Sequence, residues 1–502
     1  MRYFLSFLIC IVLVSVSSCR KDFDTVLSFG ELGFSKDTVF LDTVFTNIGS
    51  ATYNLKVYNR SNRAITIPRI QLENGANSNY RLNVDGIPGK EFQDIDILAN
   101  DSIYVFVETT INFGAVVNPL YTDKILFDNG NNEQHVDLVT LVQDAHFIYP
   151  GRNPISLKID SLTLSGQATS IKGRFLTDAE LHFTDVKPYV IYGYAAVPSA
   201  KTAIIDAGAK IHFHNNSGFI VDKGASLKVN GTLNNKVVFQ GDRLEQAFKT
   251  IPGQWGTIWM RAGSKNNEIH HAQIKNGIVG FLVDSIGSNS TPTLTLKNVE
   301  IYNNSSYGIL GRETNILGEN LVIGNAGQAS LACTIGGTYN FTHSTFANYW
   351  NNSLRQLPAV LVNNHFTYLN ASGQEITETR DLHAANFTNC IFDGNNNIEF
   401  VLDKVDGSIF NYTIKNCMIS FTDSNDTYAN NAELNFDDAT HYVNVIINGT
   451  SHFKNSSINE LIIGQNSDAI NKATSVLPTF DILGVDRTTS PDIGAYQHIT
   501  FD

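Results

Sequence analysis

Hydrophobic and polar residues follow two different patterns along the chain, and the first covers roughly residues 27–147. Residues 38–45 are strand-like, and at 53–57, 103–107 and 136–140 every second residue belongs to one predicted, mostly apolar face. Turn-forming residues separate the runs, as at Asp128-Asn129-Gly130. Alternation with period two between turns is typical of antiparallel strands that bury one face. This part of the chain therefore predicts a compact antiparallel β-sandwich.

Beyond about residue 200 the pattern changes to a repeat. A six-residue segment close to polar-small-x-apolar-x-Asn begins at His271, Asn298, Asn320, His343, Asn389 and Asn416. The starting residues are 27, 22, 23, 46 and 27 positions apart. We interpret the interval of 46 as two repeats, with residues 365–370 as the segment between them. A period of 22 to 27 residues without helical periodicity predicts a parallel β-solenoid.

The fourth residue of each segment forms the predicted interior column of the solenoid. The column comprises Ile274, Ile301, Ile323, Phe346, Tyr368, Phe392 and Ile419. Cys390 and Cys417 share another column, so we expect them to be stacked in the core. Asparagine at the turns tolerates a left-handed backbone and can bond to the same residue in the next repeat. Such ladders account for the 54 Asn residues without invoking any function.

The composition agrees with an all-β chain and narrows the function classes. The 502 residues include 37 Gly and 31 Phe but only 3 Met, which favours strands and tight turns over helices. The net charge of −13 argues against a nucleic-acid partner, which would require a basic surface. After residue 19 the cysteines are Cys333, Cys390 and Cys417. They are odd in number and lack a C-x-x-C spacing, so we expect neither a disulfide framework nor a zinc site.

Residues 1–18 have the features of a targeting segment rather than of a folded element. Arg2 precedes an apolar run that ends near residue 14 and is too short to span a bilayer. The small residues at 16–18, followed by Cys19, resemble the lipobox of bacterial lipoproteins. That resemblance implies that Cys19 begins the mature chain and anchors it to a membrane through acyl chains. An ordinary secretory signal with an incidental cysteine is the alternative.

Motifs at both ends of the repeat region carry a second resemblance. The segments at 207–232, 237–243 and 254–259, and Asp492-Ile493-Gly494-Ala495-Tyr496 near the end, are the motifs concerned. They resemble the corresponding parts of right-handed parallel β-helix lipoproteins of the Bacteroidota, which belong to the pectin-lyase-like fold group. The resemblance implies an outer-membrane lipoprotein that faces the periplasm or the cell surface. It implies no particular activity, because this fold hosts lyases, hydrolases, adhesins and binding proteins.

The patterns predict an all-β chain in which a parallel β-solenoid follows an immunoglobulin-like β-sandwich, and the resemblance implies that the solenoid is a right-handed parallel β-helix. The likeness to immunoglobulin domains is architectural only, because no Cys…Trp…Cys pattern is present. The predicted divisions are a lipoprotein signal peptide at 1–18, the sandwich at 19–147, a linker and N-terminal cap at 148–200, the β-helix at 201–474 and a C-terminal capping tail at 475–502. Caps are expected because the open end of a solenoid would pair with other chains.

Few residues are candidates for catalysis or metal binding. Asp437 and Asp438 are an adjacent carboxylate pair that could act as acid and base, although we expect a solvated loop there. His212 and His214 are two residues apart on a predicted strand and so share a face. Without a third ligand, a surface pair is expected rather than a zinc site. No cofactor is predicted, although oxygen-rich loops leave Ca²⁺ open.

Aromatic residues on the repeats are the candidates for ligand binding. Trp255 and Trp259 would share one face of a regular strand, and together with Tyr302 they could stack against sugar rings. Burial of these rings in caps or loops is the alternative, and the pattern favours it because aromatic rings bury the most area.

The missing catalytic motifs decide the predicted function. The G-H-G and R-I-K runs of related hydrolases do not occur in the chain. We therefore expect a non-catalytic cell-envelope lipoprotein, attached to the membrane by its lipid anchor, that binds a polysaccharide or a surface protein. A polysaccharide lyase or glycoside hydrolase with a divergent site is the first alternative. A purely structural envelope component is the second.

Overall fold

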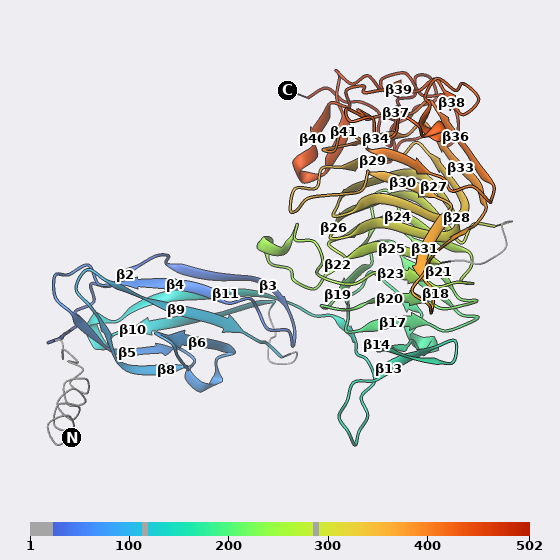
Figure 1. The fold of residues 1–502 in the computed structure, drawn as a ribbon. Helices are drawn as coiled ribbons and strands as arrows, with labels where there is room; N and C mark the ends of the chain where they lie inside the picture. Colours follow the sequence, from blue (N-terminus) through green and yellow to red (C-terminus); the bar gives the residue numbers. More distant parts are fainter. Residues whose placement is uncertain (1–23, 113–118, 285–290, 502) are drawn as a thin grey trace, which may run out of the picture. The chain divides into compact units, whose positions relative to one another are not determined.

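The computed structural model describes residues 24–112, 119–284 and 291–501, and contacts divide the chain into two compact units. The first unit ends at Gln143 and the second begins at Asp144. Strands are the main regular elements of both units (Figure 1). Among the described residues, no helix is long and apolar enough to cross a membrane. Cys19 and the predicted signal peptide lie outside the described residues.

The first unit contains two sheets that share one hydrophobic core. One sheet consists of β1 (Val26–Leu27), β3 (Thr38–Phe45), β5 (Ile65–Leu72), β8 (Glu91–Ile97), β10 (Leu120–Phe127) and β11 (Gln134–Gln143). The other consists of β2 (Gly33–Phe34), β4 (Tyr53–Tyr58), β6 (Tyr80–Val84), β7 (Ile87–Gly89) and β9 (Ser102–Thr109). Two short 3-10 helices, η1 (Gly75–Asn77) and η2 (Gly130–Asn132), lie between strands. Leu55, Val105 and Leu138 are fully buried, so the period-two pattern located these strands correctly.

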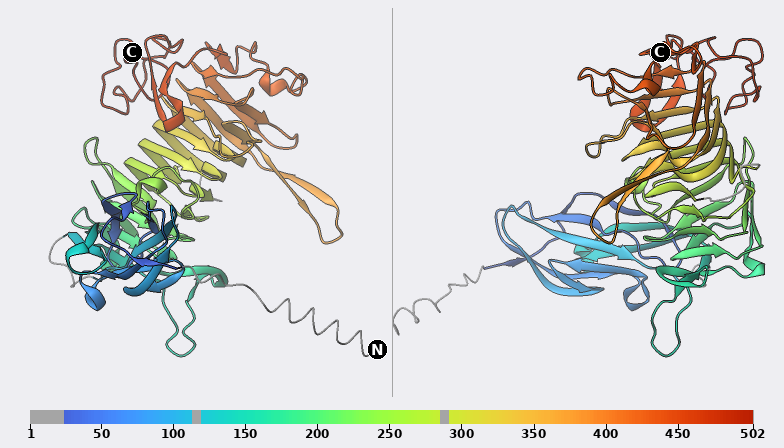
Figure 2. Two further views of the ribbon diagram at one scale, coloured as in Figure 1. Left: turned by 90° about the vertical axis from the view of Figure 1, so that its left-hand side faces the viewer. Right: turned by 45° about the vertical axis from the view of Figure 1, so that its right-hand side comes forward.

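The second unit is dominated by one large sheet whose strands pair in parallel, in layers (Figure 2). The register sorts them into three columns, and one strand segment from each column, taken in chain order, makes one repeat. The first column runs through β12 (His146–Ile148), β16 (Tyr189–Ile191), β19 (Lys210–Phe213), β22 (Val237–Gly241), β24 (Asn267–Lys275), β26 (Leu294–Asn304), β27 (Tyr307–Ala326), β29 (Thr345–Asn348), β34 (Ile391–Gly394), β37 (Met418–Ile419) and β39 (Ile446–Ile447).

The other two columns include further segments of some of the same long strands. The second runs through β14 (Gln167–Phe175), β17 (Tyr194–Val197), β20 (Gly218–Val221), β23 (Ile258–Met260), β25 (Val279–Asp284), β27, β28 (Ala329–Thr342), β30 (Val360–Asn363) and β35 (Phe400–Asp403). The third runs through β15 (His182–Phe183), β18 (Thr202–Asp206), β21 (Ser226–Asn230), β24, β26, β27, β28, β33 (Leu382–Thr388), β36 (Phe410–Lys415) and β38 (Tyr442–Val443).

Smaller elements project from the columns. Antiparallel pairs join β13 (Ser161–Leu164) to β14, β31 (His365–Leu369) to β32 (Glu375–Thr379), and β40 (Phe453–Asn455) to β41 (Glu460–Ile463). The 3-10 helices are η3 (Asp178–Glu180), η4 (Gln246–Phe248), η5 (Ala432–Leu434) and η6 (Ser456–Ile458).

The predicted interior column is present and fully buried. Residues paired in successive repeats are Ile274, Ile301, Ile323, Phe346, Phe392 and Ile419. The rings of Phe346 and Phe392 stack with their centroids 5.8 Å apart. Cys390 and Cys417 are buried free thiols in neighbouring repeats, as expected. Each repeat thus buries the apolar face of the next, which no single repeat could do alone.

Tyr368 does not belong to this column, and its predicted position was wrong. Phe346 pairs directly with Phe392, whereas Tyr368 lies in the hairpin of β31 and β32 and is 41% exposed. The 46-residue interval is therefore one repeat with an inserted hairpin, not two repeats. Phe366 and Tyr368 stack on one face of that hairpin. Their spacing of two residues is the same as that of apolar positions within a repeat, so the hairpin resembles a repeat in the sequence.

The first residues of the repeat segments form a ladder of left-handed turns. The residues are His271, Asn298, Asn320, His343, Asn389 and Asn416, and their φ angles lie between 45° and 58°. Within the ladder, the Asn320 amide donates to Oδ1 of Asn298 over 2.8 Å. Asparagine tolerates this backbone better than most residues because its side chain bonds locally. These bonds explain part of the asparagine excess.

The two ends of the stack differ from the predicted plan. Residues 148–200 are not a linker, because they contribute β13 to β17 to the sheet and the first repeat begins at β12. The tail after residue 475 follows the side of the stack: its Gly494 N–H donates to the Asn389 carbonyl, and its Ala495 N–H to Oγ1 of Thr345. Phe421, Tyr428 and Phe436 instead pack against the last part of the interior core. Ile493 and Ala495 are fully buried, so their apolar side chains explain why the tail packs sideways.

Candidate functional site

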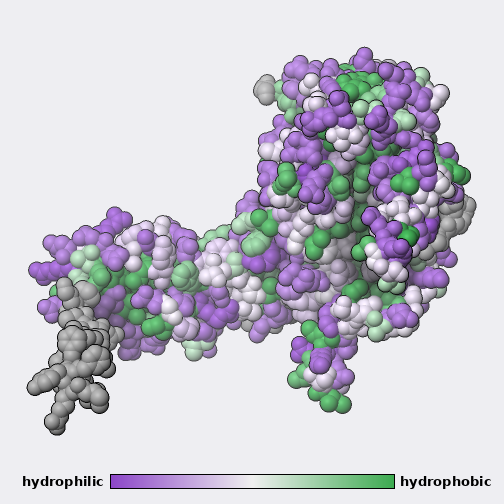
Figure 3. Space-filling model, in the orientation of Figure 1, coloured by the Kyte–Doolittle hydropathy of each residue, from purple (hydrophilic) through white to green (hydrophobic). Residues whose placement is uncertain are grey.

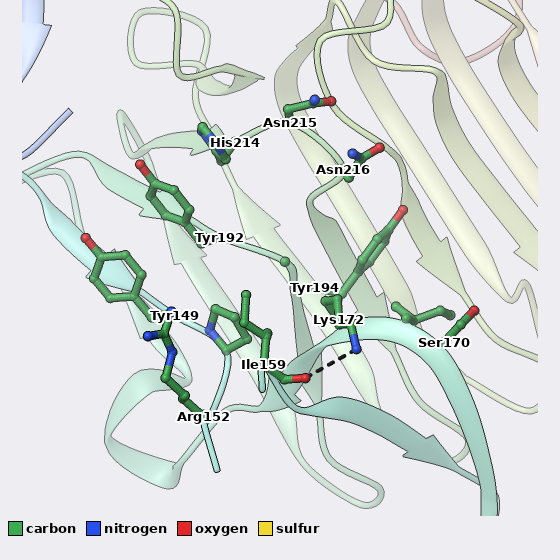
Figure 4. A pocket seen from close by; sticks show the side chains of 13 residues that line it. Tyr149, Arg152, Ile159, Ser170, Lys172, Tyr192, Tyr194, His214, Asn215 and Asn216 are labelled. Carbon is green, nitrogen blue, oxygen red and sulfur yellow. Dashed lines mark hydrogen bonds between the residues drawn. The ribbon is translucent and has the colours of Figure 1, made fainter. Parts of the chain in front are cut away.

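Exposed apolar surface alone does not identify a binding site in this molecule. The face in Figure 3 is mostly hydrophilic, with apolar residues in scattered patches. Cavities are more informative, because ligand sites are concave and combine apolar walls with a few polar groups. A cavity of about 800 Å³ opens beside the first repeats of the second unit (Figure 4). We call it the aromatic groove.

One wall of the aromatic groove is a column of residues contributed by successive repeats. The wall consists of Tyr149, Tyr192 and His214, and Asp242 continues the column beyond the cavity lining. Each of the four directly follows a strand of the first column, β12, β16, β19 or β22. These strands are paired in register up to their last residues. Backbone hydrogen bonds of 2.9 to 3.0 Å then continue the pairing by one residue. The four side chains are therefore stacked because the strands that carry them are paired in register.

The rings of this column contact one another. The centroids of Tyr149 and Tyr192 are 5.0 Å apart, and those of Tyr192 and His214 are 4.3 Å apart. Nδ1 of His214 lies 2.7 Å from the carboxylate of Asp242, whose side chain is only 5% exposed. Tyr149 at the other end is 48% exposed. Figure 4 shows the three rings in a row along one side of the cavity.

The tyrosine hydroxyls that line the groove are protonated at neutral pH, and their environment raises their pKa values further. Burial raises the pKa of Tyr192, and the nearby Asp242 charge raises it further. Burial also raises the pKa of Tyr149 and of Tyr194, which lies across the cavity. At neutral pH these hydroxyls are therefore hydrogen-bond donors as well as acceptors.

The remaining walls supply cations and amides. Nζ of Lys172, on β14, donates to the Ile159 carbonyl over 3.2 Å and to Oγ of Ser161 over 2.9 Å. Arg152 is exposed, and the Asn215 and Asn216 amides line the same cavity. The groove thus combines aromatic rings with two cations and several neutral polar groups, an arrangement that suits a ligand with both apolar faces and hydroxyl groups.

The predicted aromatic set is not brought together. Trp255 is fully buried, stacks 4.4 Å from Phe213 and donates from Nε1 to the Lys275 carbonyl. Its ring has no face exposed to a sugar. Trp259 packs against a separate cluster outside the core and donates to Asp284. The two do not share a face because β23 begins only at Ile258 and Trp255 precedes the regular strand.

The other predicted site residues also lie apart. Tyr302 is 8% exposed and lines a different cavity. The expected surface pair with His214 is wrong for His212, which is buried with its Nδ1 3.0 Å from the Gly241 carbonyl. Burial lowers the pKa of His212 to about 4. In the described ranges, no three His, Cys, Asp or Glu side chains are grouped so that they could hold a metal ion.

Asp437 and Asp438 lie in an exposed turn rather than in a cleft. Asp437 is exposed, and the Asp438 carboxylate accepts the N–H and the hydroxyl of Thr440 over 2.9 and 2.6 Å. These hydrogen bonds lower the pKa of Asp438, so the group stays ionised and is poorly suited to be a general acid.

Sequence reasoning missed Tyr149 and Tyr192. A signal was present, because each follows an isoleucine at the end of a short apolar run, in Ile148-Tyr149 and Ile191-Tyr192. The two lie 43 residues apart, since the β13–β14 hairpin is inserted between them. That insertion hides the period of the later repeats.

Comparisons with known proteins identify no family. No protein-family model matches the chain, and no curated protein matches it. Among solved structures, one match is a family 123 glycoside hydrolase from Clostridium perfringens, described in a study of glycolipid glycan hydrolysis. It has 14% sequence identity and a TM-score of 0.16, and the match covers 22% of this chain and 23% of that one. A likeness of this size carries no argument about fold or activity.

Proposed function

We propose that this protein is a cell-envelope lipoprotein whose second unit binds a glycan in the aromatic groove. The observation that carries the proposal is the column of Tyr149, Tyr192 and His214 beside a cavity of about 800 Å³. Protonated phenols and side-chain amides match the hydroxyl groups of a neutral sugar. The net charge of −13 argues against nucleic acid as the partner. A concave site favours a polysaccharide over the flat surface of a protein.

The proposed architecture is a right-handed parallel β-helix that follows an immunoglobulin-like β-sandwich. Three columns of parallel strands and a continuous interior stack support the first part. Two sheets around one core support the second. The proposed location is the outer membrane, on the periplasmic or cell-surface face, with Cys19 as the lipidated residue. No cofactor is part of the proposal, and Ca²⁺ remains an additive to include in binding tests.

Replacing Tyr149 tests the proposed glycan site. We expect the chain without its signal peptide to bind at least one member of a panel of neutral and acidic polysaccharides. Tyr149→Ala should weaken that affinity about tenfold, because an aromatic side chain at a binding site contributes more than 1 kcal/mol. Isothermal titration calorimetry measures the change. The matched control is Tyr104→Ala in the first unit, since Tyr104 is 47% exposed and Tyr149 is 48% exposed. Equal affinity of both variants would refute this site.

A hydrolase or lyase is the second candidate, and one observation favours it. Asp242 holds the His214 imidazole at the edge of the groove, as in many general acid–base pairs. Incubation with the bound polysaccharide, followed by assays for reducing ends and for unsaturated sugar ends, separates the candidates. If the protein produces new reducing or unsaturated sugar ends, and a His214 variant does not, the function is catalysis rather than binding.

Lipidation of Cys19 is tested in the membrane fraction. We expect mass spectrometry of the mature chain to find Cys19 as an acylated N-terminal residue, because several acyl chains give stable anchoring. Cys19→Ser should release the protein into the soluble fraction. Cys10→Ser, within the predicted signal peptide, should leave anchoring intact. An unmodified Cys19 in the membrane fraction would contradict the proposal.

A further inference from the structure

A second cavity, of about 470 Å³, lies on the outer face of the first column of strands, several repeats beyond the aromatic groove. Gln273 and Lys275 of β24 and Glu300 and Tyr302 of β26 form its floor. The strands are in register there, so Lys275 lies directly beside Tyr302. Residues of β41, η6 and the C-terminal tail, including Leu461 and Leu483, form an apolar wall. We call it the lysine cavity.

The carboxylates of the lysine cavity already have partners. Glu300 accepts Nζ of Lys236 over 2.7 Å and the Tyr302 hydroxyl over 3.2 Å. Glu460 pairs with Lys454 over 3.2 Å. Burial and the neighbouring Tyr496 and Glu300 raise the pKa of Tyr302, so its hydroxyl stays protonated. The negative charges that line the cavity are therefore compensated within the protein.

Two of its ammonium groups are not compensated in the same way. In the described part of the chain, neither Lys249 nor Lys275 forms an ion pair with a carboxylate. Burial lowers the pKa of Lys275, and the positive charge of Lys249 lowers it further, whereas the nearby Glu300 carboxylate acts in the opposite direction. Two like charges beside one partly desolvated cavity repel each other, and a bound anion would relieve the repulsion. The chain as a whole is acidic, with a net charge of −13, which makes a local cationic site distinctive.

We propose that the lysine cavity binds a small organic anion, a carboxylate, sulfate or phosphate group on a monosaccharide-sized body. The cations Lys249 and Lys275 would receive the anionic oxygens, and the wall with Leu461 and Leu483 would contact the body of the ligand. The volume of about 470 Å³ lies within the range of about 300 to 1,000 Å³ found for ligand pockets. This site shares no residue with the aromatic groove and does not depend on the glycan proposal.

Calorimetric titration of the full mature chain tests the proposal. The probes are glucuronate, glucose 6-sulfate and glucose 6-phosphate, with glucose as the uncharged control and inorganic phosphate as the anion without a body. We expect saturable binding of at least one charged sugar, none of glucose, and a preference that identifies the anionic group. Lys275→Met and Lys249→Met should each weaken binding about tenfold or more, as expected for a lost hydrogen bond to a charged group.

The controls separate this site from the groove and from misfolding. Lys265→Met, at an exposed lysine outside the cavity, should bind like the unmodified chain. Tyr149→Ala should also leave the affinity for the anion unchanged, whatever it does to glycan binding. Because Lys275→Met could disturb the packing, reductive methylation of the unmodified chain with ¹³C and NMR titration provide a second readout. The resonances assigned to Lys249 and Lys275 should shift saturably with the charged sugar. Unmoved resonances, or equal binding of glucose, would overturn the proposal.

Discussion

Glu399→Gln is expected to destabilise the second unit by about 3–5 kcal/mol, the usual cost of leaving one member of a buried ion pair alone. The Glu399 and Arg355 side chains are 0% and 1% exposed and bond through both carboxylate oxygens, over 2.5 and 2.8 Å. Glu399 also accepts the backbone N–H groups of Ala359 and Asn396. Glutamine would place an NH₂ group against one of these donors and leave the Arg355 charge uncompensated.

Tryptophan fluorescence during urea unfolding measures this effect in the full chain. All 3 tryptophans, Trp255, Trp259 and Trp350, belong to the second unit, so the signal reports that unit. Trp350 is close to the ion pair, because the Asn395 amide nitrogen donates to the Trp350 carbonyl and Oδ1 of Asn395 accepts from the Arg355 guanidinium. The control Lys201→Ala removes an exposed pair with Asp178 and should cost less than about 1 kcal/mol. A loss below 1 kcal/mol for Glu399→Gln would contradict the prediction.

The interior of the second unit was readable from sequence because its repeats obey simple geometry. Ile274, Ile301 and Ile323 recur at intervals of 27 and 22 residues and are paired in the structure. Strand pairing in register forces equivalent residues into one column, so a periodic pattern suffices to identify them. Tyr368 shows where this reasoning fails. An inserted hairpin brings its own apolar alternation, and periodicity alone does not distinguish it from a repeat.

The candidate sites were harder to predict from the sequence. Their residues are far apart along the chain and meet only because strands pair across an inserted hairpin or because the C-terminal tail packs against the sheet. Tyr149 and Tyr192 meet only because β12 and β16 pair over the β13–β14 hairpin. Tyr496 reaches Tyr302 because the C-terminal tail packs along the side of the stack, a path set by buried residues such as Ile493. Trp255 failed as a ligand candidate for a related reason. Trp255 precedes β23, and its ring points into the core. The residue type alone does not indicate this orientation.

The ladder of left-handed turns should make the second unit sensitive to acid. Burial, and then the positive charge of Arg487, lower the pKa of His343 from 6.5 to about 3. Oδ1 of Asn389 accepts the Thr474 N–H over 2.9 Å, which orients the Asn389 amide so that its nitrogen donates to Nε2 of His343 over 3.0 Å. That nitrogen must therefore be unprotonated in the fold. The unfolded chain binds a proton below pH 6.5 and the folded chain does not until about pH 3. Stability is thus present above pH 6.5 and is lost as the pH falls toward 3.

His343→Asn should remove this part of the acid sensitivity. One proton contributes about 1.4 kcal/mol per pH unit, so the unmodified chain should lose about 3 kcal/mol relative to the variant over two units below pH 6.5. Asparagine fits because Asn320 and Asn389 occupy the same ladder position in neighbouring repeats. Urea unfolding at several pH values measures the slope, and His383→Asn, at an exposed histidine, is the control. His212 should leave some slope in the variant, because burial lowers its pKa to about 4. If both variants lost stability as steeply as the unmodified chain, His343 would not be the group that couples folding to protons.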